Sequence, residues 1–161
     1  MATRDKQKRR ELVHALFTTA VEGGINYWAE VDEYRWSVPG SDPQVEDVDG
    51  FVAKVLPSEG EWGVFDDDKD KASLTIDRAV VERGLERWIE WLTTGKRNSL
   101  GAACEPASDK EWRRDPYSPS GPYWRQFLGD LQAQNWDAVD YDADLADAIV
   151  QLGLFDKVVY G

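Results

Sequence analysis

The sequence predicts one α+β domain, in which an antiparallel sheet of about four strands packs with about four helices. Segments with helical spacing of apolar residues alternate along the chain with segments rich in aromatic and β-branched residues, which are typical of strands. The length of 161 residues suits a single domain spanning 1–161. Hydrophobic residues make up 42% of the chain, which is too much apolar mass for a disordered protein.

The first third of the chain predicts a helix followed by a strand. A helix over residues 5–22 would carry one broad apolar face formed by Leu12, Val13, Leu16, Phe17, Ala20 and Val21. We expect the pair Gly23-Gly24 to end this helix, because glycine is the usual stop residue. Residues 25–38 then alternate aromatic and β-branched residues with polar ones, which predicts a strand with a bulge near Asp32 and Glu33.

The middle of the chain predicts short strands and one well-defined helix. Strands are expected over residues 50–56, 62–65 and 72–76, after a turn at the proline- and glycine-rich residues 39–43. The helix follows, with Asp77 or Thr75 as its N-cap and Gly95 as its stop. Its apolar stripe is predicted to consist of Val81, Leu85, Trp88 and Leu92, with Ile89 beside it.

The last third begins with residues 96–122, whose glycines and prolines predict a long irregular loop. Helices are then predicted over residues 122–134 and 142–152, the second with Asp142 as its N-cap. Residues 158–160 are expected to close the sheet as a terminal strand.

The charge balance limits the classes of partner. Asp and Glu total 31 against 19 Lys and Arg, giving a net charge of −12, which argues against direct binding to nucleic acid or to an anionic membrane. A partner attracted by charge would be basic. The sequence has no apolar run long enough to span a bilayer and no secretory signal pattern near its start, so a cytoplasmic location is expected.

The residues that usually hold metals or perform nucleophilic chemistry are scarce. The chain contains a single cysteine, Cys104, and a single histidine, His14, so it cannot assemble a zinc site of the usual kind and has no thiol-enzyme pattern. The acidic run at residues 66–70 lacks the ligand spacing of a calcium loop. We therefore predict no metal, no cofactor and no catalytic residue.

A ligand site is one interpretation of the segment EGGINYW at residues 22–28. Where a helix gives way to a strand, backbone N–H groups, an amide and aromatic rings can converge on a planar or phosphorylated ligand. The candidate ligand-binding residues are Gly23, Gly24, Asn26, Tyr27, Trp28 and Arg35. The structural alternative is that the glycines and Asn26 form a turn while the two aromatic rings pack.

Acidic and aromatic residues suggest a protein-interaction surface instead. Residues 22–49 contain eight acids and one base, and residues 137–147 contain five acids and no base. On one shared face they could imitate the phosphate spacing of a nucleic acid. The candidate interaction residues are Glu30, Asp32, Glu33, Trp112, Tyr117, Asp137, Asp140 and Asp144. If the protein were an enzyme, Glu30, Asp32 and Glu33 would be its best acid–base candidates.

Two segments of the chain carry a resemblance to a family. GGINYW at residues 23–28 and LGLFDKVVYG at residues 152–161 resemble the GG-x-NYW and LFG(E/D)-x-VYG segments of a family of small actinobacteriophage-like proteins. Here Asp156-Lys157 replaces the more usual Gly-Glu. The resemblance implies a phage origin and the host cytoplasm as the compartment, but it brings no established activity.

The expectation from these observations is a non-enzymatic phage accessory protein. It would bind and inhibit a host factor, of defence or of nucleic-acid processing, that has a basic surface. The first alternative is a sponge that binds a small nucleotide-like ligand through the GGINYW segment, often at a subunit interface, so a homodimer stays open. The second alternative is a small carboxylate-dependent enzyme.

Overall fold

Three strands form an antiparallel sheet in the order β1-β2-β3, with β2 in the centre. They are β1 (Ala29–Arg35), β2 (Val52–Pro57) and β3 (Leu74–Asp77). The structure is a computed structural model that describes residues 3–57, 73–94, 122–137 and 139–155. The strands predicted at residues 62–65 and 158–160, the stop at Gly95 and most of the loop predicted over residues 96–122 lie outside this described part.

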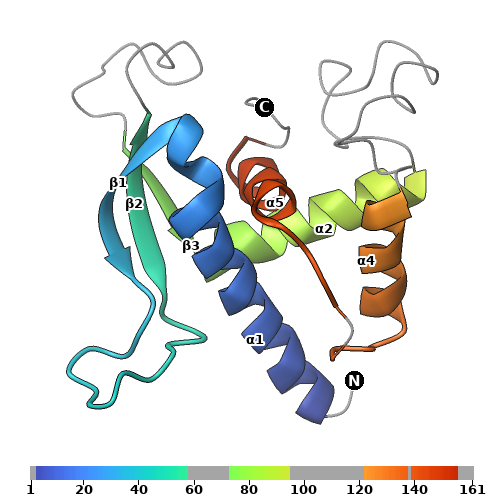
Figure 1. The fold of residues 1–161 in the computed structure, drawn as a ribbon, viewed down its shortest axis with the longest axis horizontal. Coiled ribbons are helices and arrows are strands. Elements are labelled where there is room, and N and C mark those ends of the chain that lie inside the picture. Colours follow the sequence, from blue (N-terminus) through green and yellow to red (C-terminus); the bar gives the residue numbers. More distant parts are fainter. Residues whose placement is uncertain (1–2, 58–72, 95–121, 138, 156–161) are drawn as a thin grey trace.

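The described residues also form four helices, which confirms the predicted α+β class, with three strands in this part of the chain where about four were expected. The helices are α1 (Thr3–Thr19), α2 (Arg78–Thr94), α4 (Pro122–Gln132) and α5 (Ala143–Phe155). Helix α1 lies next to the sheet, α2 and α5 cross in the middle, and α4 stands at the far end (Figure 1). The predicted N-caps are confirmed, because Asp77 accepts a hydrogen bond from the Val80 amide at 3.0 Å and Asp142 from the Leu145 amide at 2.8 Å.

The transition from α1 to β1 differs from the prediction. Helix α1 continues as a π-helix over Ala20–Gly24 and then as a 3₁₀ helix over Ile25–Tyr27, so the glycine pair does not end the helical path. The strand consequently starts at Ala29 and not at residue 25. The reason lies in packing: a Cβ on Gly24 would lie 2.6 Å from the carbonyl oxygen of Ala143, so glycine serves here for close approach to α5.

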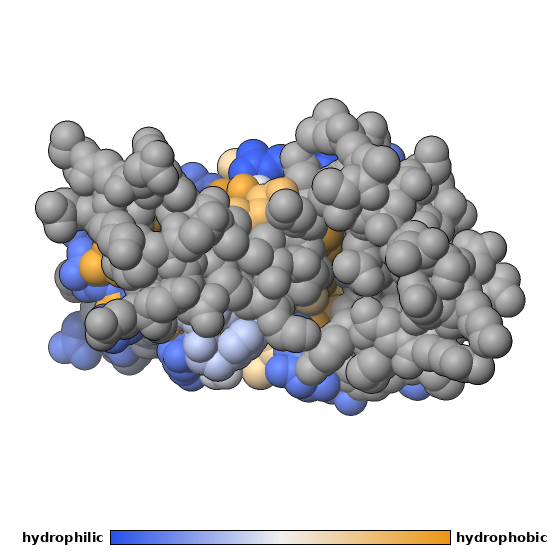
Figure 2. Space-filling view, turned by 90° about the horizontal axis from the view of Figure 1, so that it is seen from above, coloured by the Kyte–Doolittle hydropathy of each residue, from blue (hydrophilic) through white to orange (hydrophobic). Residues whose placement is uncertain are grey.

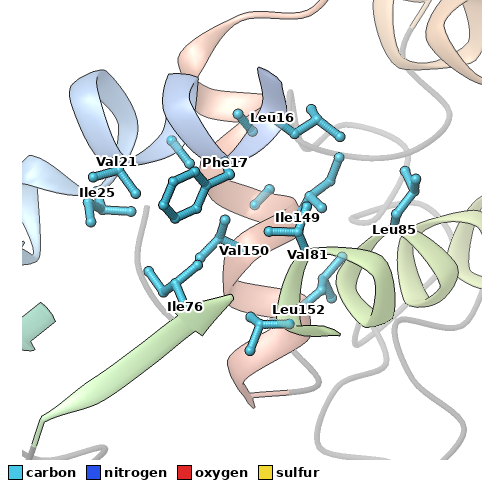
Figure 3. Close-up of a cluster of buried hydrophobic side chains, with 14 of the residues drawn as sticks. Leu16, Phe17, Val21, Ile25, Ile76, Val81, Leu85, Ile149, Val150 and Leu152 are labelled. Atoms are coloured by element: carbon cyan, nitrogen blue, oxygen red, sulfur yellow. The ribbon is translucent and has the colours of Figure 1, made fainter. Parts of the chain in front are cut away.

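The core lies between the inner face of the sheet and the helices. The predicted apolar face of α1 is buried throughout, and so are Val81, Leu85 and Trp88 of the predicted stripe on α2. Figure 3 shows side chains from α1, its π-helical extension, β3, α2 and α5 meeting in one cluster, with Phe17 and Ile149 among them. The sheet therefore buries one face only and leaves the other to solvent.

Helices α2 and α5 approach each other closely through two glycines. A Cβ on Gly84 would lie 1.9 Å from the carbonyl oxygen of Ile149, and one on Gly153 would lie 2.0 Å from that of Val80. Across the same contact the Nε of Arg83 donates to the Gly153 carbonyl at 2.8 Å. This crossing fixes where α5 lies, and with it the position of every polar side chain that α5 carries.

Candidate functional site

The GGINYW segment meets α5 at a buried carboxylate, Asp147. The indole Nε1 of Trp28 donates to Oδ1 of Asp147 at 2.8 Å. The hydroxyl of Tyr27 donates to Oδ2 at 2.8 Å, and Nε2 of Gln151 donates to the same oxygen at 2.7 Å. We call these four residues the Asp147 junction. Three donors from two distant parts of the chain thus satisfy both oxygens of a carboxylate that water hardly reaches.

Burial dominates the electrostatics of the Asp147 junction. Only 3% of the Asp147 surface is exposed, and this burial raises the pKa of its carboxyl to about 6. The hydrogen bonds from Trp28, Tyr27 and Gln151 act in the opposite direction, because they stabilise the charged form, but they do not cancel the cost of desolvation. The Asp147 carboxyl therefore changes its charge in mildly acidic solution.

The structure brings together only some of the predicted ligand-binding residues. Gly24, Tyr27 and Trp28 lie at the Asp147 junction, where Trp28 is fully buried and Tyr27 keeps 53% of its surface exposed. The amide of Asn26 donates back to the Glu22 carbonyl at 3.1 Å, as a turn residue does. Gly23 is exposed beside Ala143. Of the structural alternative, only the packing of the Trp28 ring is seen: the two glycines lie in the π-helical continuation of α1 and do not form a turn, and Tyr27 stays half exposed.

Arg35 lies away from the other predicted ligand-binding residues. Arg35 is the last residue of β1 and lies six residues after Ala29. In an extended strand this separation corresponds to a distance of about 20 Å. There its guanidinium donates to the Gly50 carbonyl and lies 3.9 Å from the Asp47 carboxylate. Arg35 consequently supports the connection between β1 and β2 and does not face the Asp147 junction.

The predicted bulge in β1 is present and changes which side chains share a face. Val31 pairs with Val55 and Glu33 pairs with Lys54, so Asp32 has no partner in the β2 register. Glu30 pairs with Leu56, which is two residues from Lys54 and therefore on the same face of β2. In a regular strand Glu30 and Glu33 would point to opposite faces. The bulge places both on the outer face of the sheet.

Glu30 and Glu33 therefore share the outer face, and exposed Asp32 lies between them at the bulge; we call these three residues the β1 acidic face. Lys54 lies 3.7 Å from Glu33 in a solvent-exposed ion pair. Half-buried Val52 and Leu56 flank Lys54 on β2. Where grey atoms do not cover the end of the molecule that carries the sheet, Figure 2 shows hydrophilic residues beside smaller hydrophobic areas.

The second acidic segment lies elsewhere. Asp137, Asp140 and Asp144 are exposed, in the segment that leads from α4 into α5 and in its first turn. The sheet and this connecting segment run on different sides of α1 (Figure 1). The side chain of Asp147, in the same acidic segment, is buried. Trp112 and Tyr117 lie outside the described residues.

The acid–base candidates do not surround the aromatic segment. Glu30, Asp32 and Glu33 lie along the solvent-exposed strand, whereas the carboxylate that contacts Tyr27 and Trp28 is Asp147. Over residues 3–57, 73–94, 122–137 and 139–155, no group of three or more His, Cys, Asp or Glu residues is placed to hold a metal. No helix in this described part is both long and apolar enough to cross a membrane.

Sequence reasoning missed Asp147 and Gln151, although a signal was present. Every residue from Leu145 to Gly153 is buried, so α5 is surrounded by protein on all sides. A helix that is apolar almost all round predicts burial for its few polar residues too. Asp147 and Gln151, four residues apart on such a helix, could therefore have been identified as a buried polar pair that needs partners elsewhere.

Comparisons with known proteins add no relative. No protein-family model, no curated protein and no solved structure matches this chain.

Proposed function

We propose that this protein acts by occupancy: its β1 acidic face binds a basic surface of another protein and blocks it. In line with the phage-like segments at residues 23–28 and 152–161, the partner would be a host factor of defence or of nucleic-acid processing. Such factors carry basic grooves that bind phosphates, and a row of carboxylates can occupy such a groove.

The observation that carries the proposal is the bulge at Asp32. Without it, Glu33 would point toward the inner face of the sheet, where β2 carries buried Ala53 and Val55. With it, Glu30 and Glu33 share the outer face and exposed Asp32 lies between them, and among the described residues Lys54 forms the one ion pair with these three carboxylates. Bulges that redirect side chains are common next to functional sites.

The physical mechanism is electrostatic complementarity. Exposed carboxylates steer a basic partner toward the face and raise the association rate, while half-buried Val52 and Leu56 offer apolar contact once water is displaced. Because exposed charges are screened within about 8 Å at physiological ionic strength, binding should weaken steeply as salt is added.

The sponge alternative has less support from the described residues. A nucleotide pocket at the GGINYW segment would need Trp28 and Gly24 to face the ligand, yet both are buried against α5. Arg35, the cation expected to contact a phosphate, lies at the other end of β1. Tyr27 is the exposed member, and its hydroxyl already donates to Asp147.

The test is affinity capture from an actinobacterial lysate. Wild-type protein is compared with a variant carrying Glu30→Lys and Asp32→Lys, which leaves the Glu33–Lys54 pair in place. The matched control carries Glu86→Lys and Asp130→Lys, on α2 and α4, and changes the net charge by the same amount. Thermal unfolding of all three proteins verifies that they fold.

The proposal expects one protein to be enriched by the wild type and by the control, lost with the β1 variant, and reduced at high salt. Equal enrichment by both charge-reversed variants would contradict it, because the location of the charge would then not matter. A captured protein that is lost equally from both variants would indicate attraction by net charge alone.

A further inference from the structure

Outside the Asp147 junction and the β1 acidic face, α1 and the segment before α5 enclose a groove of about 230 Å³. One wall consists of Lys8, Glu11, Leu12 and Ala15, which follow one face of α1. The other wall consists of Trp136, Val139 and Tyr141. This groove joins apolar side chains, two aromatic rings and charged groups in one small volume, the composition of a ligand site.

A second, more polar hollow of about 250 Å³ adjoins the groove and shares Lys8 and Trp136 with it. The acidic residues Asp5 and Asp137 are among those that line it. The indole Nε1 of Trp136 donates to Oδ1 of Asp5 at 3.3 Å, which orients the ring between the two hollows. Among the described residues that line the two hollows, Asp5, Glu11 and Asp137 face one basic residue, Lys8, so the balance of charge favours a cation.

We propose that these two hollows form one binding site for a cationic side chain, above all an arginine of a basic partner. Leu12, Ala15 and Val139 would contact the methylene stem, while the guanidinium would lie near the aromatic rings and the carboxylates. Arginine suits such a site because its planar cation stacks on aromatic rings and forms bidentate hydrogen bonds with carboxylates.

The positive charge of Lys8 would repel a bound arginine side chain, but Lys8 forms an ion pair with Glu11. Its ammonium lies 3.8 Å from the Glu11 carboxylate, and both side chains are about two-fifths exposed. An exposed pair of this kind is weak, so an incoming guanidinium can take over Glu11 while Lys8 turns to solvent. Removal of Lys8 should therefore strengthen binding of a cation and weaken binding of an anion.

The inference rests on the proposed function only in that the basic partner would supply the arginine. The binding site itself can therefore be tested with a small arginine derivative in place of the partner. N-acetyl-arginine amide is titrated into the full chain and followed by the indole N–H signal of Trp136 in ¹H–¹⁵N NMR, assigned with Trp136→Phe. The uncharged control is N-acetyl-norleucine amide, and the anionic control is inorganic phosphate. The same titrations are repeated with Lys8→Ala.

The inference predicts a saturable shift of the Trp136 signal with the arginine probe, no comparable shift with the norleucine probe, and binding two- to fivefold tighter in Lys8→Ala. Binding of phosphate that is lost in Lys8→Ala would overturn it in favour of an anion site. Absence of any saturable shift would also overturn it. Neither result would affect the capture experiment, because Glu30 and Asp32 lie on the sheet.

Discussion

Trp28 and Asp147 lie 119 residues apart in the sequence, yet the indole of the first donates a 2.8 Å hydrogen bond to the carboxylate of the second. Both side chains are buried, Trp28 completely and Asp147 to all but 3%. The contact joins the end of the α1 helical path to α5. The aromatic residues of the GGINYW segment therefore have a structural role, because they hydrogen-bond Asp147 and pack at one side of the core.

The stability contributed by Asp147 should depend on pH. Burial raises the pKa of its carboxyl from 3.8 to about 6, so the folded state holds this proton more tightly than the unfolded chain does. The contribution is therefore fully present below about pH 4 and is lost as the pH rises through 6. The difference corresponds to on the order of 3 kcal/mol of unfolding free energy.

Asp147→Asn isolates this effect, because asparagine has nearly the same shape and cannot ionise. Between pH 4 and pH 7, the unfolding free energy of the wild type should fall relative to that of the variant, as measured by urea denaturation. The comparison cancels the titration of the other carboxyl groups, which both proteins share. A constant difference across this range would show that Asp147 keeps an ordinary pKa.

Tyr27→Phe should raise the pKa of Asp147 further. The variant removes one of the three donors that stabilise the charged carboxylate, while most of the exposed ring surface stays unchanged. We expect the ¹³C titration of the Asp147 carboxyl to move to higher pH. Asn26→Ala is the control within the same segment, because the one interaction described for the Asn26 side chain is its hydrogen bond to the Glu22 carbonyl. An equal shift of the Asp147 pKa in both variants would contradict the direct hydrogen bond from Tyr27.

The two neighbouring glycines should respond differently to alanine. At Gly24 the added Cβ would lie 2.6 Å from the Ala143 carbonyl oxygen and 2.8 Å from the Cβ of Asp147. Gly24→Ala should therefore lower the unfolding free energy by about 1–3 kcal/mol, since α5 must move away. At Gly23 the nearest atom is 3.5 Å away, an ordinary contact, so Gly23→Ala should change stability by less than about 0.5 kcal/mol. Equal effects on thermal unfolding would rule out the close approach.

The crossing of α2 and α5 gives a sharper glycine test. Gly84→Ala places a Cβ 1.9 Å from the Ile149 carbonyl oxygen, and backbone cannot yield as a side-chain end can. We expect a loss of at least about 3 kcal/mol in chemical denaturation, the upper end of the cost of overpacking. Gly129→Ala on α4 meets no atom within 4 Å and should stabilise the protein by up to about 1 kcal/mol. A tolerated Gly84→Ala would mean that the helices lie farther apart.

The elements that the sequence predicted well are those with local signals. The apolar face of α1, the stripe residues Val81, Leu85 and Trp88 on α2, and the caps at Asp77 and Asp142 depend on spacing within a few residues, and these were confirmed. The bulge at Asp32 was predicted too, because the alternation of polar and apolar residues shifts there. Each of these features is decided by neighbours in the chain.

The features that the prediction missed depend on distant contacts. Gly24 has the appearance of a helix stop, but its need for space comes from Ala143, which no local pattern reveals. Asp147 stands among exposed acids in the sequence and is buried only because α5 enters the core. Arg35 was grouped with Tyr27 and Trp28 because it is near in sequence, whereas an extended strand carries it away from them.

Measured affinity decides whether the β1 acidic face recognises a basic partner, as we propose. The dissociation constant of the captured partner would be measured for wild type, for Glu30→Lys with Asp32→Lys, and for Glu86→Lys with Asp130→Lys, each at low and high salt. We predict binding at least about tenfold weaker for the β1 variant, equal to about 1.4 kcal/mol, and within about twofold of wild type for the control. Equal affinities for the two variants, or an affinity of the wild type that salt does not change, would contradict the proposal.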